Sequence, residues 1–127
     1  MKLRIKGNSL RLRLSRPEVN QVAAEGRLEN QTDFGAGVLR FVFTASETVS
    51  ALSARFENGS IVVVAPKAQV AAWASNEDVG LYSEQPVSET DFLSIAVEKD
   101  FRCLDRSRAE DDEADNYPHP ALKPKAS

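Results

Sequence analysis

The feature that most constrains the fold is an internal duplication. When the chain is shifted by 51 positions against itself, the strand, turn and helix signals of residues 2–45 and 53–98 coincide. The apolar positions agree better than the residue identities, which is typical of an old duplication. Aligned pairs are Arg4 with Arg55, Ile5 with Phe56, Leu10 with Ile61, Leu12 with Val63, Val22 with Trp73 and Leu28 with Val79. Three extra residues later in the second copy align Leu39, Phe41 and Phe43 with Leu93, Ile95 and Val97.

The pattern of each repeat predicts, in order, a strand, a tight turn, a strand, a helix and two further strands. In the first repeat, Leu3 and Ile5 alternate with basic residues, which predicts a strand with one buried face. Gly7-Asn8 supplies residues that tolerate positive φ, so a reversal is expected there before a second alternating strand over 10–14. Ser15 with Glu18 forms the pattern of a capping box. A helix therefore begins here, with Val19, Val22 and Ala23 as its apolar stripe.

The ends of the elements carry further signals. Gly26 is placed to end the first helix, and strands follow near 27–33 and 38–45. In the second repeat the turn is Asn58-Gly59, and the continuously apolar run 61–64 predicts a strand buried on both faces. Pro66 opens a second short helix, in which Trp73 is expected to lie in the core. The last strands are expected near 79–85 and 92–98.

These signals predict a β-dominated α+β fold. We expect a small pseudo-two-fold barrel, or two packed sheets, with two short helices in a single compact domain over 1–104. The chain of 127 residues is long enough to bury a core without disulfides, and its single Cys excludes an intramolecular one. Residues 105–127, acidic and then Pro-containing, are expected to form a disordered tail. Charges interrupt the N-terminal apolar positions, so we expect neither a signal peptide nor a membrane span, and a cytoplasmic protein.

Charge is distributed unevenly between the repeats. Residues 1–50 carry 8 Lys/Arg and 5 Asp/Glu, a balance of +3, whereas residues 51–100 carry 3 and 8, a balance of −5. On the first hairpin, alternation places Lys2, Arg4 and Lys6 on one strand face and Arg11 and Arg13 on the next, with Arg16 nearby. Such a patch suits phosphate contacts, and Arg also reaches guanine edges. It suits equally well an acidic partner, including the chain's own acidic half or tail, or an ordinary solvated strand face.

The stretch Lys6-Gly7-Asn8-Ser9-Leu10-Arg11-Leu12-Arg13-Leu14 resembles the opening of swapped-hairpin antitoxins and transition-state regulators of the AbrB–MazE type. The second repeat resembles the same pattern at Gly59 to Lys67. The resemblance covers roughly residues 2–34 and 53–85. It implies a small β-barrel, normally completed by two chains that exchange hairpins, and DNA binding through basic residues on the barrel strands. A tandem copy would complete that barrel within one chain.

Over its whole length, the chain is similar to a family of uncharacterised bacterial proteins. The similarity lies in the opening and in the ending Val-Glu-Lys-Asp-Phe-x-Cys-Leu, here Val97 to Leu104. That family has no established activity, so this resemblance supports a bacterial, cytoplasmic domain and implies no mechanism.

Nothing in the sequence points to an enzyme. There is no phosphate loop, dinucleotide fingerprint or nucleophile elbow. A metal site would require Cys103, Asp105, Asp111 or Asp112, and His119 to converge, and their spacing matches no standard zinc signature. We expect no cofactor and no metal, a structural Cys103, and an exposed His119 in the tail.

The sequence therefore predicts a non-enzymatic, regulator-like or antitoxin-like module. The expected DNA contacts are Arg4, Lys6, Asn8, Ser9, Arg11 and Arg13. The alternative is a protein-interaction module that holds an acidic or basic partner, and a third, weaker class is a metal-dependent enzyme. The expected assembly is a monomeric pseudo-dimer or a homodimer.

Overall fold

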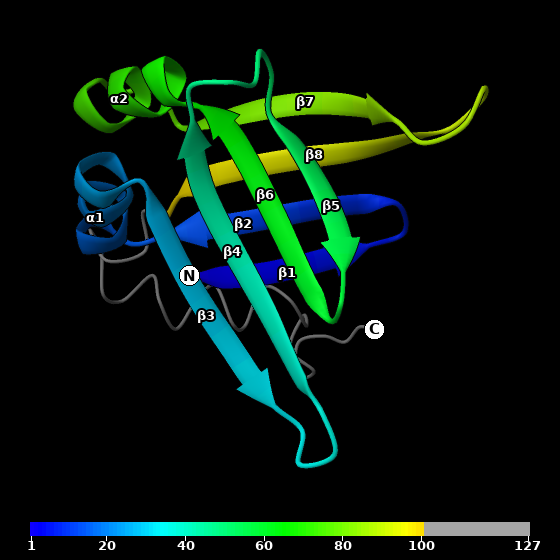
Figure 1. Cartoon of the computed structure of the whole chain (residues 1–127). Helices are drawn as coiled ribbons and strands as arrows, with labels where there is room; N and C mark the ends of the chain where they lie inside the picture. The colour runs from blue at the N-terminus through cyan, green and yellow to red at the C-terminus, as the bar shows by residue number, and fades with distance from the viewer. Residues whose placement is uncertain (101–127) are drawn as a thin grey trace, which may run out of the picture.

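A computed structural model describes residues 1–100, in which two repeats of five elements follow each other (Figure 1). The first repeat contains β1 (Lys2–Lys6), β2 (Ser9–Leu14), α1 (Arg16–Glu25), β3 (Arg27–Asp33) and β4 (Val38–Ser46). The second contains β5 (Ser53–Glu57), β6 (Ser60–Pro66), α2 (Lys67–Ser75), β7 (Gly80–Pro86) and β8 (Phe92–Lys99). The prediction of a β-dominated α+β fold with two short helices is confirmed.

The two repeats exchange hairpins. Sheet A has the strand order β1-β2-β8-β7 and sheet B the order β3-β4-β6-β5, so each sheet joins one hairpin from each repeat. The hairpin partners are antiparallel, whereas the central pairs β2 with β8 and β4 with β6 are parallel. The strands of sheet B cross steeply in front of those of sheet A (Figure 1). Because every sheet needs both repeats, neither repeat completes a sheet by itself.

Local signals in the sequence act as predicted. Ser15 and Glu18 form a reciprocal capping box: the Ser15 N–H donates to Glu18 Oε1 at 2.8 Å, and the Glu18 N–H donates to Ser15 Oγ at 3.4 Å. Gly26 ends α1 in the left-handed region at φ 82°. In the second hairpin Asn58 and Gly59 both have positive φ, at 50° and 74°, as a type I′ turn requires.

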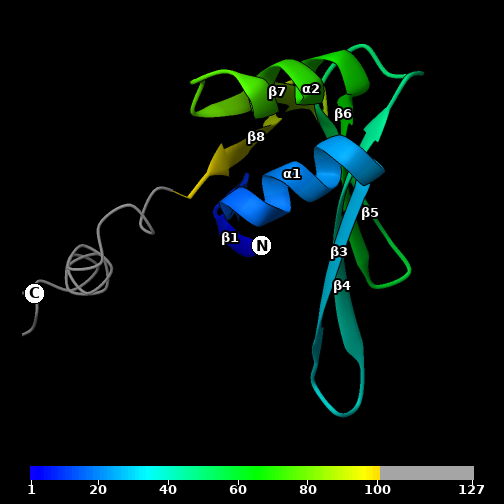
Figure 2. The same ribbon diagram turned by 90° about the vertical axis from the view of Figure 1, so that its left-hand side faces the viewer.

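The core lies between the inner faces of the sheets, and the two helices close one end of it (Figures 1 and 2). Trp73 from α2 is 1% exposed and packs edge-to-face against Phe43 from β4, with ring centroids 6.3 Å apart. The Trp73 indole N–H donates to the Val79 carbonyl at 3.2 Å, so this aromatic side chain is buried without an unpaired donor. The predicted core position of Trp73 is confirmed.

Three details of the sequence interpretation are wrong. Leu28 corresponds to Leu81 and not to Val79: Leu28 pairs with Phe43, Leu81 pairs with the equivalent Val97, and Val79 is largely exposed. The cause is a longer connection after the second helix, residues 76–79 against Gly26 alone.

The other two errors concern burial. The run 61–64 is buried on both faces only in its second half, where Val63 and Val64 point to opposite faces; Ile61, near the open end of the sheets, and Val62 are half-buried. Ala23 is exposed, so the buried side chains of α1 are Val19 and Val22.

The predictions for the tail, for Cys103 and for His119 lie outside the described residues. Within residues 1–100, no helix is both long enough and apolar enough to span a membrane.

Candidate nucleic-acid interface

The first hairpin gathers basic side chains on one face. In its register Lys2 lies opposite Arg13, Arg4 opposite Arg11, and Lys6 opposite Ser9. Successive residues of a strand point to opposite faces, and the leucines between the arginines of β2 are buried in the core. The basic side chains therefore lie on the outer face of sheet A. We call this set the basic face: Lys2, Arg4, Lys6, Arg11 and Arg13.

Members of the basic face differ in their partners. Arg11 and Arg13 share one carboxylate from the second repeat, with Nε atoms 3.6 Å and 3.8 Å from Glu98 Oε1. Lys2 Nζ lies 3.5 Å from Asp100 Oδ2. Arg4 and Lys6 are exposed and form no ion pair within residues 1–100. These two cations are thus the most available for an external anion.

Asn8 and Ser9 lie beside the basic face but act within the fold. The Asn8 side-chain amide donates to the Phe92 carbonyl at 2.7 Å, and its own backbone carbonyl accepts from the Ser94 N–H at 3.1 Å. The Ser9 hydroxyl donates to the Lys6 carbonyl at 2.7 Å. The structure therefore brings all six predicted residues into one hairpin, and it gives Asn8 and Ser9 a role in fixing the turn against β8.

Sequence reasoning missed the acidic neighbours of the basic face. Glu98 on β8 also accepts a hydrogen bond from the Tyr82 hydroxyl at 2.9 Å. Burial raises the pKa of Tyr82, and the hydrogen bond and charge of Glu98 raise it further, although Arg11 opposes them. The Tyr82 hydroxyl therefore stays protonated and donates to Glu98. Alternation along β8 sets Ser94, Ala96 and Glu98 on one face, a signal that could have located Glu98, but it does not say which strand lies beside them.

The charge on the outer face of sheet A consequently changes from positive to negative across the sheet. Cations occupy β1 and β2, and carboxylates occupy β7 and β8, with Glu84 bonded to Ser94. Charge and hydrogen-bond donors of this kind suit the binding of an anion along the β1–β2 side of the face. Among residues 1–100, no three His, Cys, Asp or Glu side chains are grouped to hold a metal ion. The metal set considered from the sequence, which includes Cys103 and His119, falls outside the described part of the chain.

Comparison with known proteins identifies a family. No curated protein and no solved structure matches the chain significantly. The resemblance to AbrB–MazE-type proteins therefore stays a prediction. The family model described as "Family of unknown function (DUF7009)" matches residues 1–121. This agrees with the expected membership in a family of uncharacterised proteins. Since the match spans most of the 127 residues, the chain belongs to this family of unknown function.

Proposed function

We propose that this protein is a non-enzymatic, regulator-like or antitoxin-like module that binds duplex DNA through its basic face. The observation that carries the proposal is the hairpin register, which sets Arg4 directly opposite Arg11 and Lys2 opposite Arg13. Cations at these spacings form a two-row positive surface on rigid strands, and phosphate contacts of this kind supply most of non-specific DNA affinity.

Two further features support the proposal. The opening of the chain resembles that of AbrB–MazE-type regulators. The exchange of hairpins between the repeats is what a tandem copy of such a module would be expected to form within one chain. We also propose that the protein acts in the cytoplasm, as a monomeric pseudo-dimer or a homodimer.

The test is fluorescence anisotropy with a labelled DNA duplex at low and moderate salt. If Arg4, Lys6, Arg11 and Arg13 each contact one phosphate, the slope of log K against log salt is about −3.6. The triple substitution of Arg4, Arg11 and Arg13 by Ala should weaken binding at least tenfold and flatten that slope by about 2.7.

A matched control removes the same charge elsewhere. Arg27, Arg40 and Arg55 lie on sheet B and pair with Glu29 or Glu57. Their triple substitution by Ala also removes three positive charges. It should leave affinity within about threefold of the unmodified protein. Absent or salt-insensitive binding, or equal losses in both variants, would refute the proposal.

One observation favours a second candidate function. The basic face already accepts carboxylates, because Glu98 contacts Arg11 and Arg13 and Asp100 contacts Lys2. The rival is therefore a protein-interaction module whose partner presents an acidic surface. An acidic peptide that binds with higher affinity than duplex DNA at the same salt, and loses binding in the Arg4, Arg11 and Arg13 variant, would favour it.

A further inference from the structure

We propose that the space between the two sheets, at the end opposite the helices, binds a small, neutral, apolar molecule. A cavity of about 550 Å³ lies there. Its size falls within the range of about 300–1,000 Å³ typical of small-molecule sites. The apolar side chains that line it are Ile5, Leu10, Ala54, Phe56, Ile61 and Leu93.

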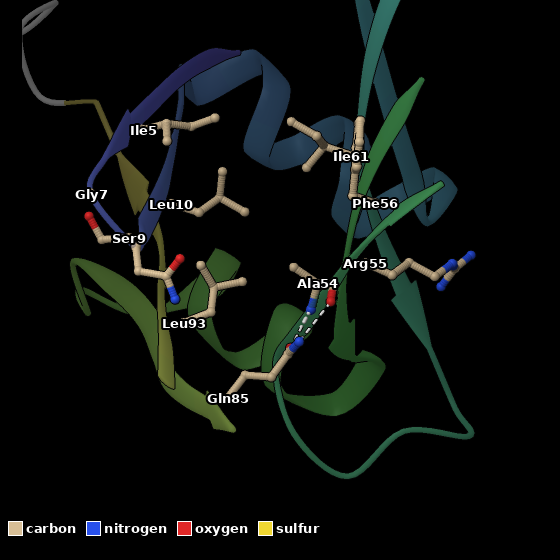
Figure 3. Close-up of a pocket in the computed structure, with 11 residues that line it drawn as sticks. Ile5, Gly7, Ser9, Leu10, Ala54, Arg55, Phe56, Ile61, Gln85 and Leu93 are labelled. Atoms are coloured by element: carbon tan, nitrogen blue, oxygen red, sulfur yellow. Dashed lines mark hydrogen bonds between the residues drawn. The ribbon is translucent and has the colours of Figure 1, made fainter. Parts of the chain in front are cut away.

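The walls come from both sheets, and two pairs of lining residues occupy equivalent positions of the repeats. Ile5 and Leu10 from sheet A face Phe56 and Ile61 from sheet B across the space (Figure 3). Shifting Ile5 and Leu10 by 51 positions gives Phe56 and Ile61. The cavity is therefore bordered by the first hairpin of each repeat, β1–β2 and β5–β6, and it is a product of the hairpin exchange.

The polar groups at its border are already engaged within the protein. Gln85 Oε1 accepts from the Ala54 N–H at 2.8 Å, and Gln85 Nε2 donates to the Ala54 carbonyl at 2.9 Å (Figure 3). The Asn8 amide and the Ser9 hydroxyl donate to backbone carbonyls. Arg55 points away from the space in Figure 3 and pairs with Glu57. The cavity consequently favours a ligand without charge.

The surroundings favour a small molecule over a strand from a partner or a second copy. An added strand would pair with the edge strand β5, but Gln85 covers the N–H and carbonyl of Ala54 on that edge. Water molecules in this open space lie against apolar side chains. Their release by an apolar ligand is favourable. The exposed side chains of Ile5 and Phe56 frame the opening.

The first test uses N-phenyl-1-naphthylamine, a neutral apolar dye that fluoresces in apolar sites, titrated into the full chain. We expect saturable binding of one dye per chain. Phe56 is 71% exposed at the cavity, and Phe34 is 70% exposed on the β3–β4 turn. Because both are on the surface, Phe56→Ser and Phe34→Ser should both fold. Phe56→Ser should weaken dye binding at least fivefold, and Phe34→Ser less than twofold.

A second pair of variants fills the cavity. Leu93→Trp places a larger side chain in it, whereas Leu39→Trp makes the same change at the equivalent position of the first repeat, which does not line the cavity. Leu93→Trp alone should abolish saturable binding, with thermal unfolding confirming that each variant is folded. The proposal is overturned if dye binding is not saturable, if both members of either pair lose it equally, or if sedimentation shows a dimer that excludes the dye.

Discussion

Replacing Glu98 with glutamine should strengthen DNA binding through the basic face. The Glu98 carboxylate lies 3.6 Å and 3.8 Å from the Nε atoms of Arg11 and Arg13, so it occupies the two arginines that a phosphate would need. The glutamine side chain would have nearly the same shape and would keep an oxygen to accept the Tyr82 hydrogen bond. The substitution thus removes the competing charge and preserves the fold.

The size of the effect follows from the exposure of the pair. The Arg11 and Arg13 side chains are each 39% exposed, so solvent screens their attraction to Glu98 and surface values apply. Two such pairs contribute about 0.4–2 kcal/mol together, at about 0.2–1 kcal/mol each. Because about 1.4 kcal/mol is a factor of ten, releasing both arginines should tighten binding by about 2- to 30-fold.

The assay is anisotropy with the same DNA duplex at about 0.15 M salt, where exposed charges beyond about 8 Å are largely screened. Glu84→Gln is the matched control: it removes the same charge from the same face, but Glu84 bonds to Ser94 rather than to an arginine. We expect that control to change affinity less than twofold. Unchanged or weaker binding by Glu98→Gln, or equal gains in both variants, would refute the competition between Glu98 and phosphate.

Three further predictions concern stability. Gly80→Ala should lower the free energy of unfolding by about 1–3 kcal/mol in urea titrations, since an added Cβ would lie 2.5 Å from the Val97 carbonyl oxygen; an unchanged midpoint would contradict this. Trp73→Ala should cost about 3–5 kcal/mol by the same assay, because the side chain is fully buried. Burial raises the pKa of Glu18, but hydrogen bonds from the Met1 amino group and Ser15 outweigh it, so the pKa falls below its ordinary 4.5. The stability that ionised Glu18 adds is therefore fully present above its ordinary pKa of 4.5 and is lost as the pH falls through the lower pKa of the folded protein. Glu18→Gln should reduce the melting temperature at pH 7 and have little effect near pH 2.

Short-range features of this fold could be predicted from the sequence because residues close together in the chain determine them. The capping box needs only Ser15 and Glu18, and the second hairpin turn needs only Asn58 and Gly59. The basic face was predictable for the same reason: alternation within β1 and β2 determines which side chains share a face, and the short turn determines their register.

Features that depend on contacts between the two repeats could not be predicted from the sequence. No local pattern indicates that β2 lies parallel to β8, and that pairing brings Glu98 beside Arg11 and Arg13. The cavity was missed because Ile5 and Phe56, 51 positions apart in the chain, face each other across it from two different sheets. The mismatch of Leu28 with Val79 arose from an insertion after α2, which a fixed shift does not detect.

The most direct test of DNA binding through the basic face is a residue-resolved one. Backbone amide NMR spectra of the ¹⁵N-labelled full chain would be recorded as a short DNA duplex is added to saturation. The account predicts that the largest shift changes cluster on residues 2–13, with Arg4, Lys6 and Arg11 among them, and fade as salt is raised. No change at saturating DNA, or a cluster on the outer face of sheet B, would contradict it.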